Sequence, residues 1–239
     1  MTANRLLILY SAVLTVAFGL GVGSTAVTAA GSNSTTFDTI NVKRINVRED
    51  DGTLRLSISN TSRAPGLILR GKEQPHPSGR KEAGLLFFNE EGTENGGLSW
   101  GGRRVDGKVQ SGGLLAFDQF EQDQVIQIGH QENNGRRSAS LVINDRPSEP
   151  LALDLAKRIQ AMPAGPARDA ELKRVREDGT FGRQRLFVGK TTDRSSAVLL
   201  SDAQGRARLL MKVSPEGSAS IDFLDESGKV VRSLSEKTS

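Results

Sequence analysis

Along most of the chain, hydrophobic residues alternate with polar ones. The first alternating positions, with one phase slip at Lys43-Arg44, are Ile40, Val42, Ile45, Val47, Leu54, Leu56 and Ile58. A period of two places alternate side chains on opposite faces of an extended strand, so this pattern predicts short β-strands.

Short turn signals separate the apolar runs. Five times, two polar or small residues precede a glycine, at 50–52, 90–92, 203–205, 215–217 and 226–228. This order suits a type I turn closed by a left-handed residue, a common three-residue hairpin loop. The last three glycines are 12 and 11 residues apart, which predicts a four-stranded antiparallel meander from Ala197 to Leu234. The segments VLLSDAQGRARLLMKV and SIDFLDESGKVVRSL are similar at a shift of 23 residues, which indicates a loose hairpin repeat.

One segment has a helical period instead. Between Pro150 and Met162, the residues Leu151, Leu155 and Ile159 are spaced for one face of a helix. Pro150 suits the first turn of that helix. After the interruption at 163–166, a second short helix is expected over 167–176.

These patterns predict an all-β fold of antiparallel hairpins and meanders, arranged as a sandwich or an open barrel, with a short helical insertion. A propeller is less consistent with the irregular hairpin spacing. The expected organisation is an N-terminal segment (1–30), a linker (31–36), a main β region (37–148), the helical insertion (149–179) and a C-terminal meander (180–239).

The N-terminal segment predicts contact with a membrane. No charged residue occurs between Leu6 and Phe37, and the apolar stretch 6–22 continues into small residues. This length favours an uncleaved transmembrane helix that enters the lipid bilayer through residues 6–30. The alternative is a signal peptide cleaved near Ala29. Arg5 favours a cytoplasmic amino terminus, so both interpretations place the remaining chain outside the cytoplasm. We therefore expect a single-pass inner-membrane protein with a periplasmic domain, or a secreted protein.

The composition excludes several kinds of site. The 239 residues include no cysteine and two histidines, and the net charge is +4. Disulfides, thiolate metal sites and thiol catalysis are thereby excluded. The paired basic residues are scattered among acids and lack aromatic stacking platforms, so no nucleic-acid partner is expected.

Several motifs imitate catalytic or binding sites without completing them. Residues 97–101 match G-x-S-x-G around Ser99, but no helix follows, and His130 is the only later histidine. The acids Asp118, Glu121 and Asp123 flank a predicted hairpin, where solvated carboxylates are common. Residues 189–191 lack the first glycine of a P-loop, and no acidic loop has the EF-hand pattern. We therefore expect no catalytic residue, metal or cofactor.

The long glycine-rich segments at 71–84 and 92–113 are expected to be contact loops. Trp100, Phe87 and Phe88 are expected to pack beneath them. The candidate contact residues are His76, Arg80, Trp100, Arg103 and Arg104.

The stretches DGTLRLSISN, GKEQPHP, GLLFFNEEGTENGGLSWGG and FDQFEQDQVIQIG resemble a family of bacterial proteins with an N-terminal hydrophobic segment and a β-rich domain. The resemblance covers residues 5–148 and fades through the helical insertion. It implies a location in the bacterial envelope. No catalytic residue can be carried over from it, and it identifies no partner.

The sequence favours a non-enzymatic accessory or scaffold subunit, anchored in the membrane, whose β domain binds the subunits of a larger respiratory or photosynthetic membrane complex. A free periplasmic or cell-surface module that binds glycan or peptide is the alternative. A hydrolase that uses Ser99, or Asp118 with Asp123, is the third hypothesis.

Overall fold

The computed structural model describes residues 34–76, 79–80 and 82–235. The chain divides into two compact units, Met1–Asn41 and Val42–Ser239. In the first unit the described residues, 34–41, form neither helix nor strand. The expected transmembrane segment lies outside the described residues. Among the residues that are described, no helix has the length and apolar character needed to cross a membrane.

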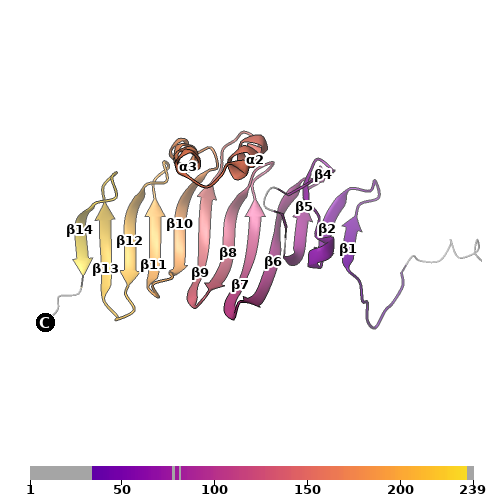
Figure 1. Ribbon diagram of the computed structural model, residues 1–239, viewed down its shortest axis with the longest axis horizontal. Helices are drawn as coiled ribbons and strands as arrows, with labels where there is room; N and C mark the ends of the chain where they lie inside the picture. Colours follow the sequence, from indigo (N-terminus) through magenta and orange to yellow (C-terminus); the bar gives the residue numbers. More distant parts are fainter. Residues whose placement is uncertain (1–33, 77–78, 81, 236–239) are drawn as a thin grey trace, which may run out of the picture. The chain divides into compact units, whose positions relative to one another are not determined.

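The second unit is built on one antiparallel sheet of twelve strands (Figure 1). Its strands in spatial order are β1 (Arg44–Arg48), β2 (Leu54–Ser59), β5 (Ala83–Phe88), β6 (Glu94–Val105), β7 (Lys108–Asp118), β8 (Gln124–Asn133), β9 (Arg136–Asp145), β10 (Arg183–Lys190), β11 (Ser196–Ser201), β12 (Ala207–Val213), β13 (Ala219–Leu224) and β14 (Val230–Ser235). Spatial order follows chain order, so the sheet is a meander. The expected strands of 197–234 are confirmed as β11–β14.

Successive strands of the sheet are joined as hairpins, except that the segment with β3 and β4 connects β2 to β5 and the helical insertion connects β9 to β10. The five turns predicted from glycine are confirmed, at Glu49–Thr53, Asn89–Thr93, Asp202–Arg206, Ser214–Ser218 and Asp225–Lys229. In each, the first N–H donates to the fifth carbonyl, and the fourth N–H donates to the first carbonyl. The fourth residue is always a glycine with positive φ, which side chains rarely adopt.

The prediction of a contact loop at 92–113 is wrong. Residues 94–105 and 108–118 are two long strands joined by the tight turn Asp106-Gly107, where both residues have positive φ. Such a turn matches the twist of a hairpin. Glycine does not identify a loop by itself, because it also occurs where neighbouring strands approach closely. A Cβ at Gly97 would lie 2.5 Å from the Leu85 carbonyl oxygen.

The helical insertion replaces the tip of the β9–β10 hairpin. Its helices are α2 (Leu153–Ala161) and α3 (Pro166–Asp178). Pro166, rather than Pro150, is the first-turn proline. Strands β9 and β10 pair directly across the insertion, so the strands before and after it belong to one sheet.

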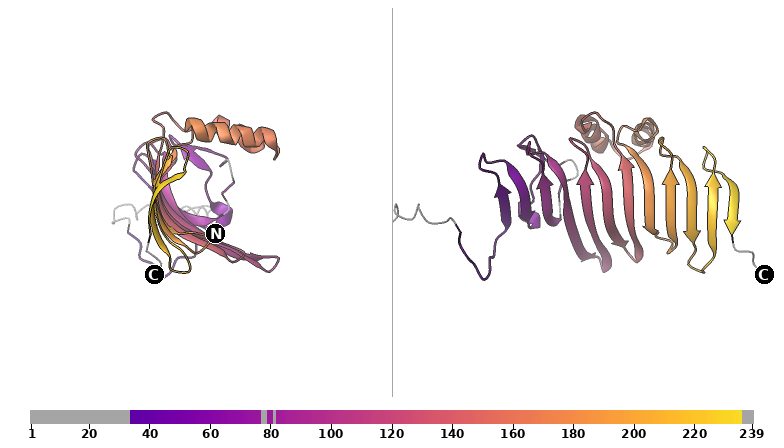
Figure 2. Two further views of the ribbon diagram at one scale, coloured as in Figure 1. Left: turned by 90° about the vertical axis from the view of Figure 1, so that its left-hand side faces the viewer. Right: turned by 180° about the vertical axis from the view of Figure 1, so that it is seen from behind.

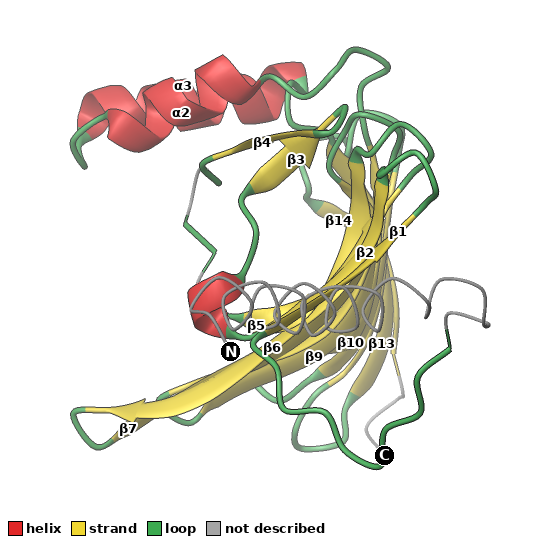
Figure 3. Cartoon of the chain, turned by 90° about the vertical axis from the view of Figure 1, so that its right-hand side faces the viewer, coloured by secondary structure: helices red, strands yellow, loops and turns green. Residues whose placement is uncertain are grey.

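A sandwich or barrel was expected, but within Val42–Ser239 the large sheet is a single layer whose described edge strands are β1 and β14. The sheet is curved, and the helices, the 3-10 turn η1 (Thr61–Arg63) and the small hairpin β3 (Leu67–Leu69) with β4 (Lys72–Gln74) lie on its inner side (Figures 2 and 3). Period-two alternation shows that a strand has one apolar face, but it does not show what covers that face.

The best-buried part of the sheet lies beneath the small hairpin. Phe88 is 3% exposed and packs with Leu54 and Ile68, and Leu86 packs against this cluster. Arg55 links the turns of the β1–β2 and β5–β6 hairpins, because its guanidinium lies 2.8 Å from the carboxylates of both Glu49 and Glu90. This cluster fixes the N-terminal hairpins against the segment that connects β2 to β5.

Close strand approach at Gly189 gives a stability prediction. A Cβ at this residue of β10 would lie 2.2 Å from the Ala139 carbonyl oxygen and 2.7 Å from the Ser140 Cα. Gly189→Ala is therefore expected to lower the free energy of unfolding by about 1–3 kcal/mol, as overpacking does. Urea denaturation checks this, with exposed Ser196→Ala on the adjacent strand as the control, expected within about 0.5 kcal/mol of wild type. Equal stability of all three proteins would contradict the close packing.

Candidate functional site

A row of aliphatic side chains crosses the whole sheet. One residue from each strand pairs with the next, so all twelve point to the same side. This middle row consists of Ile45, Ile58, Leu85, Leu98, Leu115, Ile128, Leu141, Val188, Val198, Met211, Ile221 and Leu234. None of its members is polar.

A second row runs beside it, two residues along each strand. It consists of Val47, Leu56, Phe87, Gly96, Phe117, Ile126, Ile143, Leu186, Leu200, Leu209, Phe223 and Arg232. Gly96 leaves room for Phe87 and Phe117 to stack across it, with ring centroids 6.0 Å apart. We call the middle and second rows together the apolar face.

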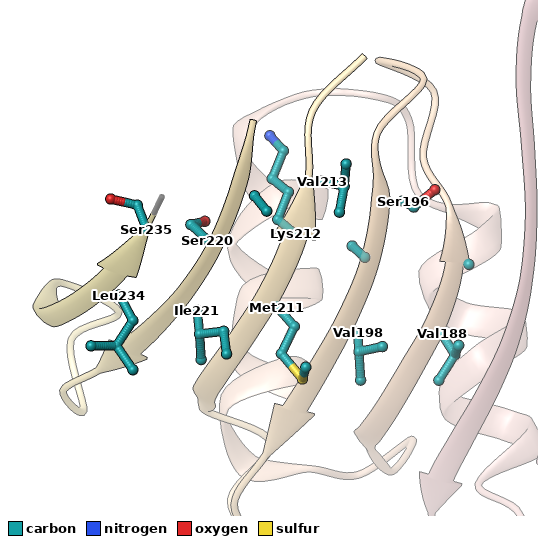
Figure 4. Close-up of a pocket in the computed structure, with 13 residues that line it drawn as sticks. Val188, Ser196, Val198, Met211, Lys212, Val213, Ser220, Ile221, Leu234 and Ser235 are labelled. Atoms are coloured by element: carbon teal, nitrogen blue, oxygen red, sulfur yellow. The ribbon is translucent and has the colours of Figure 1, made fainter. Parts of the chain in front are cut away.

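The apolar face is strongly exposed within Val42–Ser239. Ile128 is 50% exposed, and Met211 and Leu234 are 42% and 46% exposed. Over β10–β14 the middle-row side chains stand in line along a hollow of about 810 Å³ (Figure 4), whose lining also includes Ser196 and Val213 of the row on the far side from the second row. The helices lie behind the sheet in this view. An apolar surface this continuous is unusual on a soluble monomer and commonly marks an interaction site.

The apolar face is almost free of charge. Arg232, at the β14 end, is its one ionisable residue, and its guanidinium lies over the Phe223 ring, 5.8 Å from the centroid. The next row beyond the middle row includes His130 and Lys190, so the apolar face ends there at a width of two rows. Apart from Arg232 at its β14 end, the face can therefore be covered by another apolar surface without burying an unpaired charge.

A second feature lies on the inner side of the sheet. A partly open cavity of about 160 Å³ lies between strands β5–β7 and the connecting segment that includes His76 and Arg80. Arg80 pairs with Glu94 at 2.6 Å, and both side chains are mostly buried. One oxygen of Glu94 and one of Asp118 are buried without a hydrogen-bond partner among the described residues.

Burial controls the ionisation of these acids. It raises the pKa of Asp118 to about 7, and the nearby carboxylates of Glu94 and Asp123 add to the effect. Burial also raises the pKa of Glu94, although Arg80 opposes the shift. Burial lowers the pKa of His76, with the charge of Arg80 acting in the same direction. Asp118 can therefore gain or lose a proton near neutral pH.

The structure separates the expected contact residues. His76 and Arg80 line the inner cavity, whereas Trp100, Arg103 and Arg104 lie on β6. Trp100 is 50% exposed, so the expectation that it packs beneath a loop is wrong. It pairs with Gly113, on the side of the sheet that carries the apolar face. The five residues do not form one surface.

The candidate catalytic motifs are also separated. Ser99 lies inside β6 rather than at a strand-to-helix turn, and its neighbour Trp100 shares a side of the sheet with His130. Ser99 and His130 therefore point to opposite sides of the sheet. Asp123 lies 3.5 Å from Arg146, and Asp118 lines the inner cavity. Across residues 34–235, excluding 77–78 and 81, there is no group of three or more His, Cys, Asp or Glu suited to a metal ion.

Sequence reasoning missed the apolar face, although a signal was present. In five hairpins the two second-row residues are nine positions apart: 47 and 56, 87 and 96, 117 and 126, 200 and 209, and 223 and 232. The tips of these five hairpins therefore bring second-row positions into register, and Arg232 is the one charged residue among them. No protein-family model matches the chain, and no curated protein matches it either.

Proposed function

We propose that this chain is a non-enzymatic assembly module that holds another protein against the apolar face of its sheet. The observation that carries the proposal is the pair of apolar rows across twelve strands, left exposed within Val42–Ser239. The expected membrane anchor at 1–30 is part of the proposal and would keep the sheet at the outer surface of the inner membrane.

The dimensions of the apolar face indicate the chemistry of its partner. Strands lie about 4.8 Å apart, so eleven intervals extend about 53 Å. A single helix would need about 35 residues to follow that length. An extended apolar sheet matches the band more closely, because stacked sheets interdigitate their side chains about 10 Å apart. We therefore propose a protein partner that presents an apolar β-sheet.

Selective protection in the native membrane tests this function. The chain has no cysteine, so Ile128→Cys introduces a single thiol on the apolar face. The matched control is Gln131→Cys on the same strand, which points to the other side of the sheet. In membranes of the source cells, maleimide is expected to label Ile128→Cys at least about tenfold more slowly, because a bound partner restricts access. Equal labelling rates would show that the apolar face is free in the cell and would refute the proposal.

A further inference from the structure

We infer that the protein packed on the apolar face is a second copy of this chain, so that two single-layer sheets form one two-layer sandwich. This inference rests on the proposed function and names its partner. A sheet normally buries its apolar face against a second layer, and within Val42–Ser239 the described residues supply no such layer on this side.

The available area suits a stable dimer. A band about 53 Å long and about 14 Å wide covers on the order of 700 Å² on each copy. Two copies would then bury on the order of 1,500 Å², within the usual range of about 1,200–2,000 Å² for stable complexes. Contact along two thirds of the length would still bury about 1,000 Å², the lower bound expected of a biological interface.

The two rows also suit self-association. All twelve middle-row residues are aliphatic, so either relative direction of the two copies brings aliphatic side chains together. The strand spacing is the same on both copies, so the ridges of one row match the grooves of its counterpart. The Arg232 guanidinium stands at one end of the second row over the Phe223 ring, away from the centre of the band.

Concentration-dependent protection distinguishes a second copy from other occupants. The experiment uses purified full-length protein carrying Ile128→Cys, in a mild detergent, labelled with maleimide over a wide range of protein concentrations. A dimer predicts that labelling slows as concentration rises, because association follows mass action. Labelling of Gln131→Cys is expected to be independent of concentration. Molar mass from light scattering is expected to rise to that of two copies over the same range.

A charge placed on the apolar face should abolish the association of two copies. Met211→Glu, on β12 and distant in sequence from the thiol, puts a carboxylate into the middle row. It is expected to raise the dissociation constant by at least about 100-fold, because the buried charge has no partner. Ile128→Cys should then label rapidly at every concentration. Gln131→Glu adds the same charge on the other side of the sheet and is expected to leave the dissociation constant unchanged. Circular dichroism checks that both variants are folded.

The outcomes separate the two proposals. In one outcome, Ile128→Cys is protected in native membranes, but the purified protein labels rapidly and has a single-copy mass at all concentrations. This result would overturn the second copy as the partner and leave the assembly function supported. Protection of the purified chain that depends on added lipid vesicles, with a single-copy mass, would assign the face to the bilayer and overturn the inference. Rapid labelling in both settings would overturn both proposals.

Discussion

Phe88→Ala is expected to lower the free energy of unfolding by about 3–5 kcal/mol, as large core truncations do. Phe88 is 3% exposed and joins Leu54 and Ile68 in the buried cluster beneath the β3–β4 hairpin. Removing the ring leaves a cavity that β-sheet hydrogen bonds hold open, so little relaxation is expected. Chemical denaturation followed by circular dichroism measures the change.

The matched control is Phe120→Ala at the tip of the β7–β8 hairpin, where the side chain is 59% exposed. Its expected effect is within about 0.5 kcal/mol, because little buried area is lost. Equal destabilisation by the two substitutions would show that the cluster around Phe88 is not the main core. An unfolded Phe88→Ala protein at 25 °C would place the effect at the upper end of the range.

The second prediction concerns pH. Burial raises the pKa of folded Asp118 to about 7, against an ordinary value of 3.8. Between these values the folded state binds a proton that the unfolded state has lost, so stability falls as pH rises. Above pH 7 both states are ionised and the loss is complete. Ionisation of Asp118 is expected to lower the free energy of unfolding by on the order of 2 kcal/mol between pH 5 and pH 8.

Asp118→Asn should remove that dependence, because the amide does not ionise. The stability of the variant relative to wild type is therefore expected to increase by on the order of 2 kcal/mol from pH 5 to pH 8. Thermal and urea unfolding at both pH values measure the difference. Glu216→Gln, on the exposed turn between β12 and β13, is the control and is expected to stay within about 0.5 kcal/mol of wild type. If the two proteins differed in free energy of unfolding by the same amount at pH 5 and at pH 8, that result would contradict a buried, ionisable Asp118.

Local chemistry made much of the fold predictable. The x-x-Gly signals predicted five turns because a left-handed residue closes this loop and glycine adopts that conformation at little cost. The helical period at 151–162 predicted the insertion, although α2 begins at Leu153 and α3 begins at Pro166. Loops were over-predicted at 92–113 because Gly96, Gly97, Gly112 and Gly113 serve close strand contacts rather than turns.

The candidate sites depended on tertiary pairing. Ser99 and His130 are 31 positions apart, and only strand register decides that they point to opposite sides of the sheet. Arg80 and Glu94 are paired because a connecting segment folds back over β5–β7. Neither relation has a local sequence signal, since side-chain direction changes with every residue of register.

The sequence by itself determined the elements of this protein: alternating strands, glycine-closed tips and one helical insertion, each governed by backbone sterics and local periodicity. It also contained the nine-residue spacing that aligns apolar residues across each tip. Only the tertiary structure decided that all the hairpins join one sheet and that their rows form a single apolar band with one ionisable residue, Arg232, at its end. Strand pairing is a non-local choice, made by hydrogen bonding and side-chain contact between distant segments. That choice turned ordinary amphipathic strands into an extended apolar face.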